Sequence, residues 1–231
     1  MIQENVAQIL QNISSICAKL GRDPKSVTLI GVTKTADVSK IKEAIDAGIA
    51  HIGENKVQEG QNKFPSLEQL TGKKVTKHLI GHLQTNKAKH ALKFFDLIQS
   101  VDSFKLAEEI DKQAEKLGRS ADILVQIKTS GEEQKFGAGP SEALELIEQI
   151  SQLKNIRILG LMTMAPFTED ETQIRPCFQA LREIRDQAQK KFAGQEKVQM
   201  KYLSMGMTDD YKIALEEGSN MVRIGRAIFK E

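Results

Sequence analysis

Apolar residues along the chain occur in short runs, separated by longer stretches in which they recur at helical spacing. Glycine and polar residues bound the runs, and several runs are apolar almost throughout. Such runs are typical of parallel strands that are covered on both faces. We predict eight strands, at residues 27–34, 51–55, 77–84, 97–103, 121–129, 157–164, 199–207 and 221–229.

Helical patterns lie between these strands. Asp37 and Ser103 stand where they can cap helices, and Gly48 and Gly118 stand where those helices are expected to end. The helix that Ser103 can cap covers residues 106–117. The other helical patterns occupy residues 2–20, the stretch opened by Pro140, about 170–192, and 208–217.

This alternation predicts an α/β fold with a parallel sheet. Eight strands, each but the last followed by a helix or a helical turn, fit a TIM-type (β/α)8 barrel, and an open doubly wound sheet is the competing arrangement. The helix at residues 2–20 precedes the first strand and would be an additional element outside the barrel. Because no linker or low-complexity stretch interrupts the pattern, we expect one barrel domain over residues 1–231.

Composition limits the classes of partner. The chain has 231 residues, and its 33 basic and 31 acidic residues give a net charge of +2, so the charge balance calls for neither nucleic acid nor an anionic membrane. Cys17 and Cys177 occupy apolar positions of helical patterns, which favours buried thiols in a reducing cytoplasm. No apolar stretch resembles a signal peptide or a membrane span, so we expect a cytoplasmic protein.

Polar residues and glycines gather at the carboxyl ends of the predicted strands. In a barrel of this type these ends form the working face, although capping of the following helices explains part of the pattern. The strand ends contain Lys34, Glu54 and Asn55, His82, Asp102, Met164, the stretch 204–208, and the stretch 223–226.

The seventh and eighth strand ends suggest an anion site. Ser204, Gly206 and Thr208 stand just before a predicted helix, where hydroxyls and backbone N–H groups can hold a phosphate. Gly225 follows the eighth strand, where a backbone can come close to a ligand. The alternative is that Thr208 caps the helix and Gly206 forms only a turn.

Arg223 lies inside an apolar strand, between Val222 and Ile224. A guanidinium that enters a barrel interior requires acceptors, since its burial is otherwise very costly. It would then face a ligand. The alternatives are an exposed position on the outer side of the strand and a structural ion pair.

Lys34 ends the first predicted strand. A loop lysine in water is the ordinary interpretation, but this lysine shares its end of the barrel with the expected phosphate site. A lysine partly removed from water has its neutral, nucleophilic form favoured, which suits a Schiff base with a carbonyl compound. Pyridoxal 5'-phosphate (PLP) is an aldehyde that also carries a phosphate, so Lys34 is a candidate for attachment to this cofactor.

Seven motifs together extend this hypothesis. The stretches GVTK, HIGENKVQEG, HLIGHLQTNK, IQSVDS, GLMTMAP, LSMGMTDD and VRIGRAIF occur in this order over residues 27–229. In this combination the chain resembles the pyridoxal phosphate homeostasis protein family.

The resemblance implies a barrel like the N-terminal domain of alanine racemase, with PLP held as a Schiff base on Lys34. It also implies that Ser204, Gly206 and Thr208, with backbone groups of Gly225 and Arg226, hold the phosphate. Arg223 would face the pyridine nitrogen, and Asn55, His82 and Met164 would surround the ring. Lys135, in a Lys-x-Gly feature of the family, would lie at the rim. The implied function is PLP and amino-acid homeostasis, with PLP-dependent apoenzymes as recipients.

The expected chemistry agrees with a protein that is not an enzyme. An arginine opposite the pyridine nitrogen disfavours protonation of that nitrogen, so the ring is a poor electron sink. Racemisation also needs a second acid or base, which alanine racemases take from a further domain and a partner subunit. This chain ends two residues after the last predicted strand, and neither Tyr202 nor Tyr211 is an obvious replacement. We therefore expect no such domain, and a monomer.

Three alternatives remain open. A low-activity PLP-dependent racemase or lyase would use the same site. A regulatory protein would hold PLP as a structural ligand. A barrel enzyme acting on a phosphorylated sugar would explain the phosphate site but not Lys34 and Arg223 together. We expect no metal site, because Glu54 and Asp102 stand on different strand ends and His82 has no partners at ligand spacing.

Overall fold

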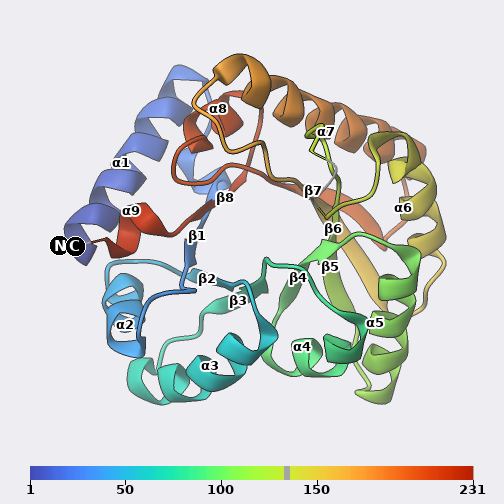
Figure 1. The fold of residues 1–231 in the computed structure, drawn as a ribbon, viewed down its shortest axis with the longest axis horizontal. Helices are drawn as coiled ribbons and strands as arrows, with labels where there is room; N and C mark the ends of the chain where they lie inside the picture. Colours follow the sequence, from blue (N-terminus) through green and yellow to red (C-terminus); the bar gives the residue numbers. More distant parts are fainter. Residues whose placement is uncertain (133–135, 231) are drawn as a thin grey trace.

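The chain folds as a closed parallel barrel, in a computed structural model that describes residues 1–132 and 136–230. Neighbouring strands pair in sequence order, and β1 pairs with β8 to close the barrel (Figure 1). The predicted (β/α)8 barrel is thus confirmed and the open sheet is excluded. The strands are β1 (Thr28–Val32), β2 (His51–Glu54), β3 (Thr76–Leu79), β4 (Leu97–Val101), β5 (Ala121–Gln126), β6 (Ile156–Met162), β7 (Val198–Ser204) and β8 (Met221–Ile224).

Helices surround the barrel, and Figure 1 shows them as an outer ring. Their apolar faces pack on the outward-facing residues of the strands and form the larger hydrophobic cluster of the molecule. They are α1 (Ile2–Lys19), α2 (Val38–Asp46), α3 (Val57–Thr71), α4 (Ala88–Phe94), α5 (Phe104–Lys116), α6 (Ala143–Ser151), α7 (Glu171–Lys191), α8 (Tyr211–Glu216) and α9 (Arg226–Phe229), with short 3-10 turns η1 (Pro24–Ser26), η2 (Thr85–Lys87) and η3 (Pro140–Glu142).

A second, smaller apolar cluster fills the barrel interior. It contains Ile30, Leu97, Leu124, Met162 and Met221. Each of these residues comes from a different strand, at a position whose side chain points into the barrel. Polar side chains occupy other interior positions, and the register pairs Ile30 with Arg223 on one side and with His51 on the other.

Several predicted strands are too long. The third is confined to Thr76–Leu79, because the chain leaves the sheet before Gly81 and His82. The eighth ends at Ile224, and the predicted remainder forms the short helix α9. The apolar residues Ala227, Ile228 and Phe229 continued the strand pattern in the sequence, but they pack as a helical turn.

Of two predicted helix caps only one is formed, and one predicted helix is shorter than expected. Asp37 does cap α2, because its Oδ1 accepts the Lys40 N–H at 2.8 Å. Ser103 occupies the N-cap position of α5, but its side chain makes no capping hydrogen bond. Helix α8 spans only Tyr211–Glu216, and Thr208 lies in the preceding turn.

The additional helix α1 lies outside the barrel, as expected. It packs against α2, α8 and α9, and the two chain ends lie side by side in Figure 1. The Asn5 amide closes this contact by donating to the Ile228 carbonyl at 3.0 Å. The predicted burial of Cys17 and Cys177 is confirmed.

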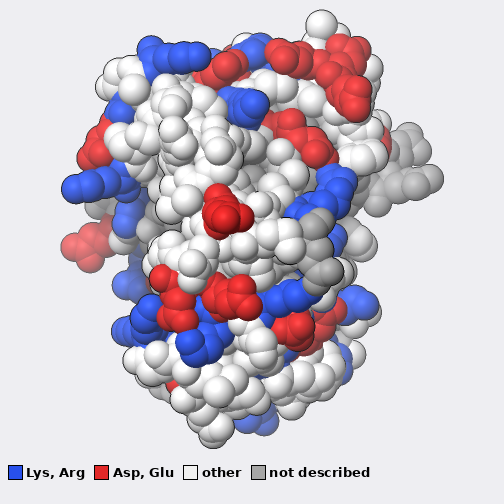
Figure 2. Space-filling view, turned by 90° about the vertical axis from the view of Figure 1, so that its left-hand side faces the viewer, with Lys and Arg blue, Asp and Glu red and all other residues white. Residues whose placement is uncertain are grey.

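Charges on the surface are mixed. Figure 2 shows basic and acidic side chains interspersed on the side of α1 and α2, with no broad area of one sign. Among the described residues, no helix is long and apolar enough to cross a membrane.

Candidate functional site

Lys34 lies two residues beyond β1, at the carboxyl end of the barrel. Its side chain is exposed, so the partial removal from water expected from the sequence is wrong. The backbone beneath it is firmly held. Thr33 is fully buried, its N–H donates to the Gly53 carbonyl at 2.9 Å, and its hydroxyl donates to Glu54 Oε1 at 2.7 Å. The structure thus fixes the base of Lys34 and leaves its amine accessible.

A buried carboxylate supports this loop from β2. Glu54 is fully buried, and its Oε1 accepts both the Thr33 hydroxyl and the Lys63 ammonium, the latter at 2.9 Å. Lys63 comes from α3 and also donates to the Thr33 carbonyl at 2.8 Å. Burial raises the pKa of Glu54, and its hydrogen bonds with Lys63 and Thr33 oppose this effect.

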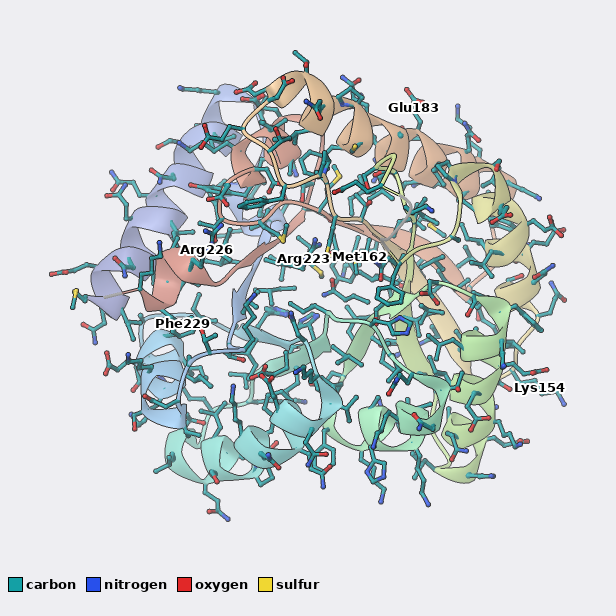
Figure 3. All side chains as sticks on the ribbon, viewed as in Figure 1. Lys154, Met162, Glu183, Arg223, Arg226 and Phe229 are labelled. Atoms are coloured by element: carbon teal, nitrogen blue, oxygen red, sulfur yellow. The ribbon has the colours of Figure 1, made fainter. Side chains whose placement is uncertain are left out.

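Arg223 points into the barrel interior from β8, and Figure 3 places it near the centre, close to Met162. The side chain is only 4% exposed. Its Nη1 donates to the Ser204 hydroxyl at 2.7 Å, and its Nη2 donates to the Thr163 carbonyl at 2.8 Å. Each terminal nitrogen carries a second N–H, so the guanidinium retains donors for a ligand. The expected interior position is therefore found, and the outward-facing alternative is excluded.

Burial also acts on the charge of this guanidinium. It lowers the pKa of Arg223 to about 10, and the negative charge of Asp210 opposes the shift. Asp210 is itself buried, which raises its pKa, while its hydrogen bond from the Met207 N–H and the charge of Arg223 lower it. Arg223 therefore remains cationic at neutral pH, and no carboxylate contacts it directly within the described residues.

The hydroxyl of Ser204 is already engaged inside the barrel. It accepts from Arg223 and donates to Gln99 Oε1 at 2.6 Å. Both hydrogen bonds stay within the protein, so this hydroxyl connects two interior side chains. A phosphate contact at Ser204 would have to share it with them.

Two glycines shape the surface beside Arg223. Gly206 has φ of +97°, and a Cβ there would lie 2.6 Å from the Cβ of Ala214. Gly225 lies against β1, where a Cβ would come within 3.2 Å of the Val32 carbonyl oxygen. No other residue type fits these positions without movement of the chain, so both loops present bare backbone.

The two glycine loops are tied to each other. Arg226, the first residue of α9, forms an ion pair with Asp209 in the turn before α8. In the described part of the chain, the backbone N–H groups of Thr208 and Asp209 have no acceptor. Helix α8 has only six residues, so an anion here would be held by these turn N–H groups more than by the dipole of a long helix.

The residues expected around a ring come from three neighbouring loops. Asn55 follows β2 and is half-buried, and its carbonyl is so close to the β3–η2 loop that a Cβ on Gly81 would lie 2.2 Å from it. Met164 follows β6 and packs on the interior cluster. The three loops stand at the same end of the barrel as Lys34 and Arg223, since the strands are parallel.

His82 follows β3 and stacks on Phe136, with ring centroids 3.8 Å apart. Its Nδ1 lies 3.6 Å from Asp102 Oδ2. Nothing in the sequence pattern indicated that Asp102 and His82 are neighbours. Lys135, expected at the rim, lies outside the described residues. No group of acidic, histidine or cysteine side chains in the described chain is arranged to hold a metal ion.

The sequence analysis missed four residues that support the site: Lys63, Gln99, His78 and His51. Lys63 is one of many helical lysines, and nothing in its spacing distinguishes it. Gln99 did leave a trace, because it is a polar residue within an apolar strand, as Arg223 is. His78 did not, because its strand also contains Thr76 and Lys77.

Comparisons with known proteins agree with this geometry. Residues 5–231 match the family model described as "Alanine racemase, N-terminal domain". A protein of Aquifex aeolicus named "Pyridoxal phosphate homeostasis protein" is 39% identical over 228 residues, covering 99% of this chain and 97% of the relative. The Escherichia coli K12 protein of the same name is 36% identical and covers 99% of this chain and 95% of the relative.

Solved structures of similar fold include a member of the same group of proteins and an alanine racemase. PipY of Synechococcus elongatus PCC7942, solved with PLP bound, has a TM-score of 0.85 and 35% identity, covering 99% of this chain and all of that one. An alanine racemase of Clostridium difficile 630 has a TM-score of 0.77 at 17% identity, and this chain covers 57% of it. That likeness concerns the fold alone. The chain belongs to the pyridoxal phosphate homeostasis protein family, within the wider family of alanine racemase N-terminal domains.

Proposed function

We propose that this protein binds PLP at the carboxyl end of the barrel and holds it as a Schiff base on Lys34. The lysine amine adds to the aldehyde carbon, and a water molecule leaves as the C=N bond forms. The site would serve PLP and amino-acid homeostasis, in line with the names of the relatives. PLP binding in PipY, at 35% identity over nearly the whole chain, supports the choice of ligand.

One observation carries the proposal. Arg223 presents a buried cation with unused donors, at the end of the barrel that also bears an accessible lysine on a rigid base. Burying a guanidinium without a carboxylate in contact is costly, so an arrangement of this kind is typical of a ligand site. The pyridine nitrogen of PLP offers an acceptor for Arg223.

The remaining residues fit the other parts of PLP. Bare backbone at Gly206 and Gly225 allows close approach of a phosphate, and the N–H groups of Thr208 and Asp209 can donate to it. Arg226 would contribute its backbone and stays paired with Asp209 through its side chain. We assign Asn55, His82 and Met164 to the surroundings of the ring, and Ser204 to the phosphate side, where its hydroxyl is shared with Arg223 and Gln99.

A titration tests the binding site. PLP is added to the purified protein and visible absorbance is followed for wild type, Lys34→Ala and Lys56→Ala. Lys56 is a matched control, since it is also an exposed lysine just beyond a barrel strand. We expect a saturable chromophore in wild type and Lys56→Ala, and none in Lys34→Ala. An unchanged chromophore in Lys34→Ala would overturn the assignment.

We propose further that the site releases PLP to PLP-dependent apoenzymes and does not catalyse a reaction. A cationic Arg223 disfavours a protonated pyridine nitrogen, which removes the electron sink that racemases and transaminases of the carboxylate-paired type use. Tyr211 is turned away from the site, because its hydroxyl accepts from Asn12 on α1. Tyr211 is therefore not placed at the mouth as a second acid or base, and Tyr202 lies within β7, two residues before its carboxyl end.

Transfer and catalysis are separated by two assays. Loaded protein is mixed with an apo form of a PLP enzyme, with and without a scavenger of free PLP, and recovery of activity is measured. We expect recovery that the scavenger does not abolish. The alternative, a weak racemase or lyase, predicts amino-acid turnover that persists through purification and is lost in Lys34→Ala. We propose that the protein acts as a cytoplasmic monomer, which light scattering of the loaded protein tests.

A further inference from the structure

Five polar side chains in the barrel interior form one hydrogen-bonded chain. Ser204 on β7 contacts Arg223 on β8 on one side and Gln99 on β4 on the other, at 2.7 and 2.6 Å. Gln99 Nε2 lies 2.9 Å from His78 Nδ1 on β3, and His78 Nε2 lies 2.9 Å from His51 Nδ1 on β2. The chain crosses the interior between β7 and β4 and leads from Arg223 to the amino-terminal end of β2.

The chain has a direction, which is set by Arg223. A guanidinium can only donate, so Ser204 accepts from it and gives its own hydroxyl proton to Gln99 Oε1. The amide nitrogen of Gln99 then faces His78. If the Gln99 amide were reversed, its NH2 group would face Ser204 and the serine proton would have no acceptor in the chain. All donors therefore point from Arg223 toward His51.

This direction fixes the state of His78. Its Nδ1 must be unprotonated to accept from Gln99, so its proton sits on Nε2 and is donated to His51 Nδ1. The ring is buried, with 1% exposed, and burial lowers the pKa of His78 to about 3, assisted by the charge that His51 can carry. A neutral His78 with its proton on Nε2 is compatible with every hydrogen bond of the chain.

Apart from Ser204, the Arg223 side chain has one hydrogen-bond acceptor among the described residues. Its second acceptor is the Thr163 carbonyl on the segment after β6, and no carboxylate contacts it within the described residues. The Ser204 hydroxyl donates its proton to Gln99 Oε1, and this leaves a lone pair of the same oxygen facing Arg223. A rotation of Gln99 would therefore release one of the two contacts that hold the guanidinium.

We propose that Gln99 and His78 are positioning residues for Arg223, holding its guanidinium in place through the fixed direction of this chain. The inference rests on the proposed function where it assigns Arg223 to the pyridine nitrogen of PLP. It adds that the orientation of Arg223 is set by an amide two hydrogen bonds away and an imidazole three hydrogen bonds away, neither of which itself faces the ligand.

The first test uses the protein without PLP. Nitrogen-15 NMR of the histidine rings is recorded for wild type, Gln99→Met and Gln126→Met. Gln126 is a matched control, since it is also a buried strand glutamine but donates to the Phe136 carbonyl, outside the chain. We expect wild type and Gln126→Met to show neutral His78 with its proton on Nε2. In Gln99→Met we expect mixed tautomers and shifted guanidinium resonances of Arg223.

A conservative variant covers the case in which Gln99→Met fails to fold. Gln99→Glu keeps the shape and can still accept from Ser204, but its second oxygen needs a donor from His78. We therefore expect His78 to carry a proton on Nδ1 in this variant. An Nε2 tautomer with Nδ1 unprotonated in Gln99→Glu would overturn the inference.

The second test uses the loaded protein. We expect Gln99→Met to shift the visible band of bound PLP and to weaken PLP binding roughly tenfold, because Arg223 loses a fixed acceptor. Wild-type band and affinity in Gln99→Met, together with loss of the chromophore in Lys34→Ala, would refute the positioning role and leave the proposed function intact. If wild type binds no PLP, the proposed function fails, and the histidine and Arg223 resonances alone decide whether the chain holds Arg223.

Discussion

The Lys63 ammonium on α3 lies 2.9 Å from the buried Oε1 of Glu54 at the end of β2. The same ammonium donates to the carbonyl of Thr33, the residue before Lys34. One helical lysine thus neutralises a buried carboxylate and fixes the loop that carries the proposed attachment point of PLP. This relationship connects the stability of the barrel mouth with its function.

Removing Lys63 is expected to destabilise the protein. Lys63→Met leaves Glu54 buried without its cation, which costs on the order of 3 kcal/mol when one partner of a buried pair is removed. Chemical denaturation measures the change in the free energy of unfolding. The matched control is Lys42→Met, which breaks the exposed Lys42–Asp46 pair on α2 and should cost less than about 1 kcal/mol. Equal losses in the free energy of unfolding would show that the buried Glu54–Lys63 pair stabilises the protein no more than the exposed Lys42–Asp46 pair.

His78 is expected to give the stability a distinct pH dependence. Its pKa in the folded protein is about 3, whereas an unfolded histidine titrates near 6.5, so its contribution is fully present above pH 6.5 and is lost as the pH falls toward 3. Between pH 7 and 5 this amounts to about 2 kcal/mol. Between pH 7 and 5 we therefore expect the free energy of unfolding to fall by about 2 kcal/mol less in His78→Asn than in wild type.

His90→Asn is the control for this prediction, because His90 is an exposed histidine on α4. Denaturant titrations at several pH values give the three curves. A wild-type slope in His78→Asn, parallel to that of His90→Asn, would contradict the assignment of a neutral buried His78.

Gly206→Ala is expected to disrupt the phosphate side of the site. Its φ of +97° is strained for alanine, and the added methyl would lie 2.6 Å from Ala214. Gly194→Ala is matched, since φ there is +85° and nothing lies within 4 Å of the added Cβ. We expect Gly194→Ala to cost about 1 kcal/mol from backbone strain alone. Gly206→Ala should cost roughly 1–3 kcal/mol more and should weaken PLP binding. Thermal unfolding and PLP titration measure both effects, and equal results for the two variants would refute the assignment of Gly206 to the phosphate side of the site.

Arg223→Lys is expected to fold like wild type and to bind PLP at least roughly tenfold more weakly. A lysine ammonium cannot reach Ser204 and Thr163 at once in the geometry of a guanidinium fork, and charged hydrogen bonds are worth about 1.5–3 kcal/mol. Arg157→Lys serves as the control, because Arg157 pairs with Asp122 on the surface near the opposite end of the barrel. PLP titration of both variants checks the prediction, which fails if Arg223→Lys binds as tightly as Arg157→Lys.

Much of the barrel could be predicted from the sequence, because its strands are short apolar runs between helical repeats. Strand ends were harder to place. Ala227, Ile228 and Phe229 are apolar enough to continue β8, and only packing of α9 against α1 makes them helical. Ser103 has the chemistry of a cap, but its side chain makes no hydrogen bond to the helix.

The site could be predicted where a charged residue stands in or directly after an apolar strand. Lys34 follows an apolar strand and Arg223 interrupts one, and both lie at the carboxyl end of the barrel, as the sequence analysis expected. The exposure of the Lys34 side chain was not predictable, since it depends on loops from other strands. Lys63 and the partners of Ser204 could not be found in this way, because their roles arise from contacts between segments up to about a hundred residues apart.

Attachment of PLP to Lys34 is tested most directly by reduction and peptide mapping. The protein is incubated with PLP, reduced with borohydride, digested and analysed by mass spectrometry. We predict a pyridoxyl adduct on the peptide that contains Lys34, and none at comparable yield on peptides with other exposed lysines. An adduct spread evenly over surface lysines, or absent from Lys34, would contradict the account.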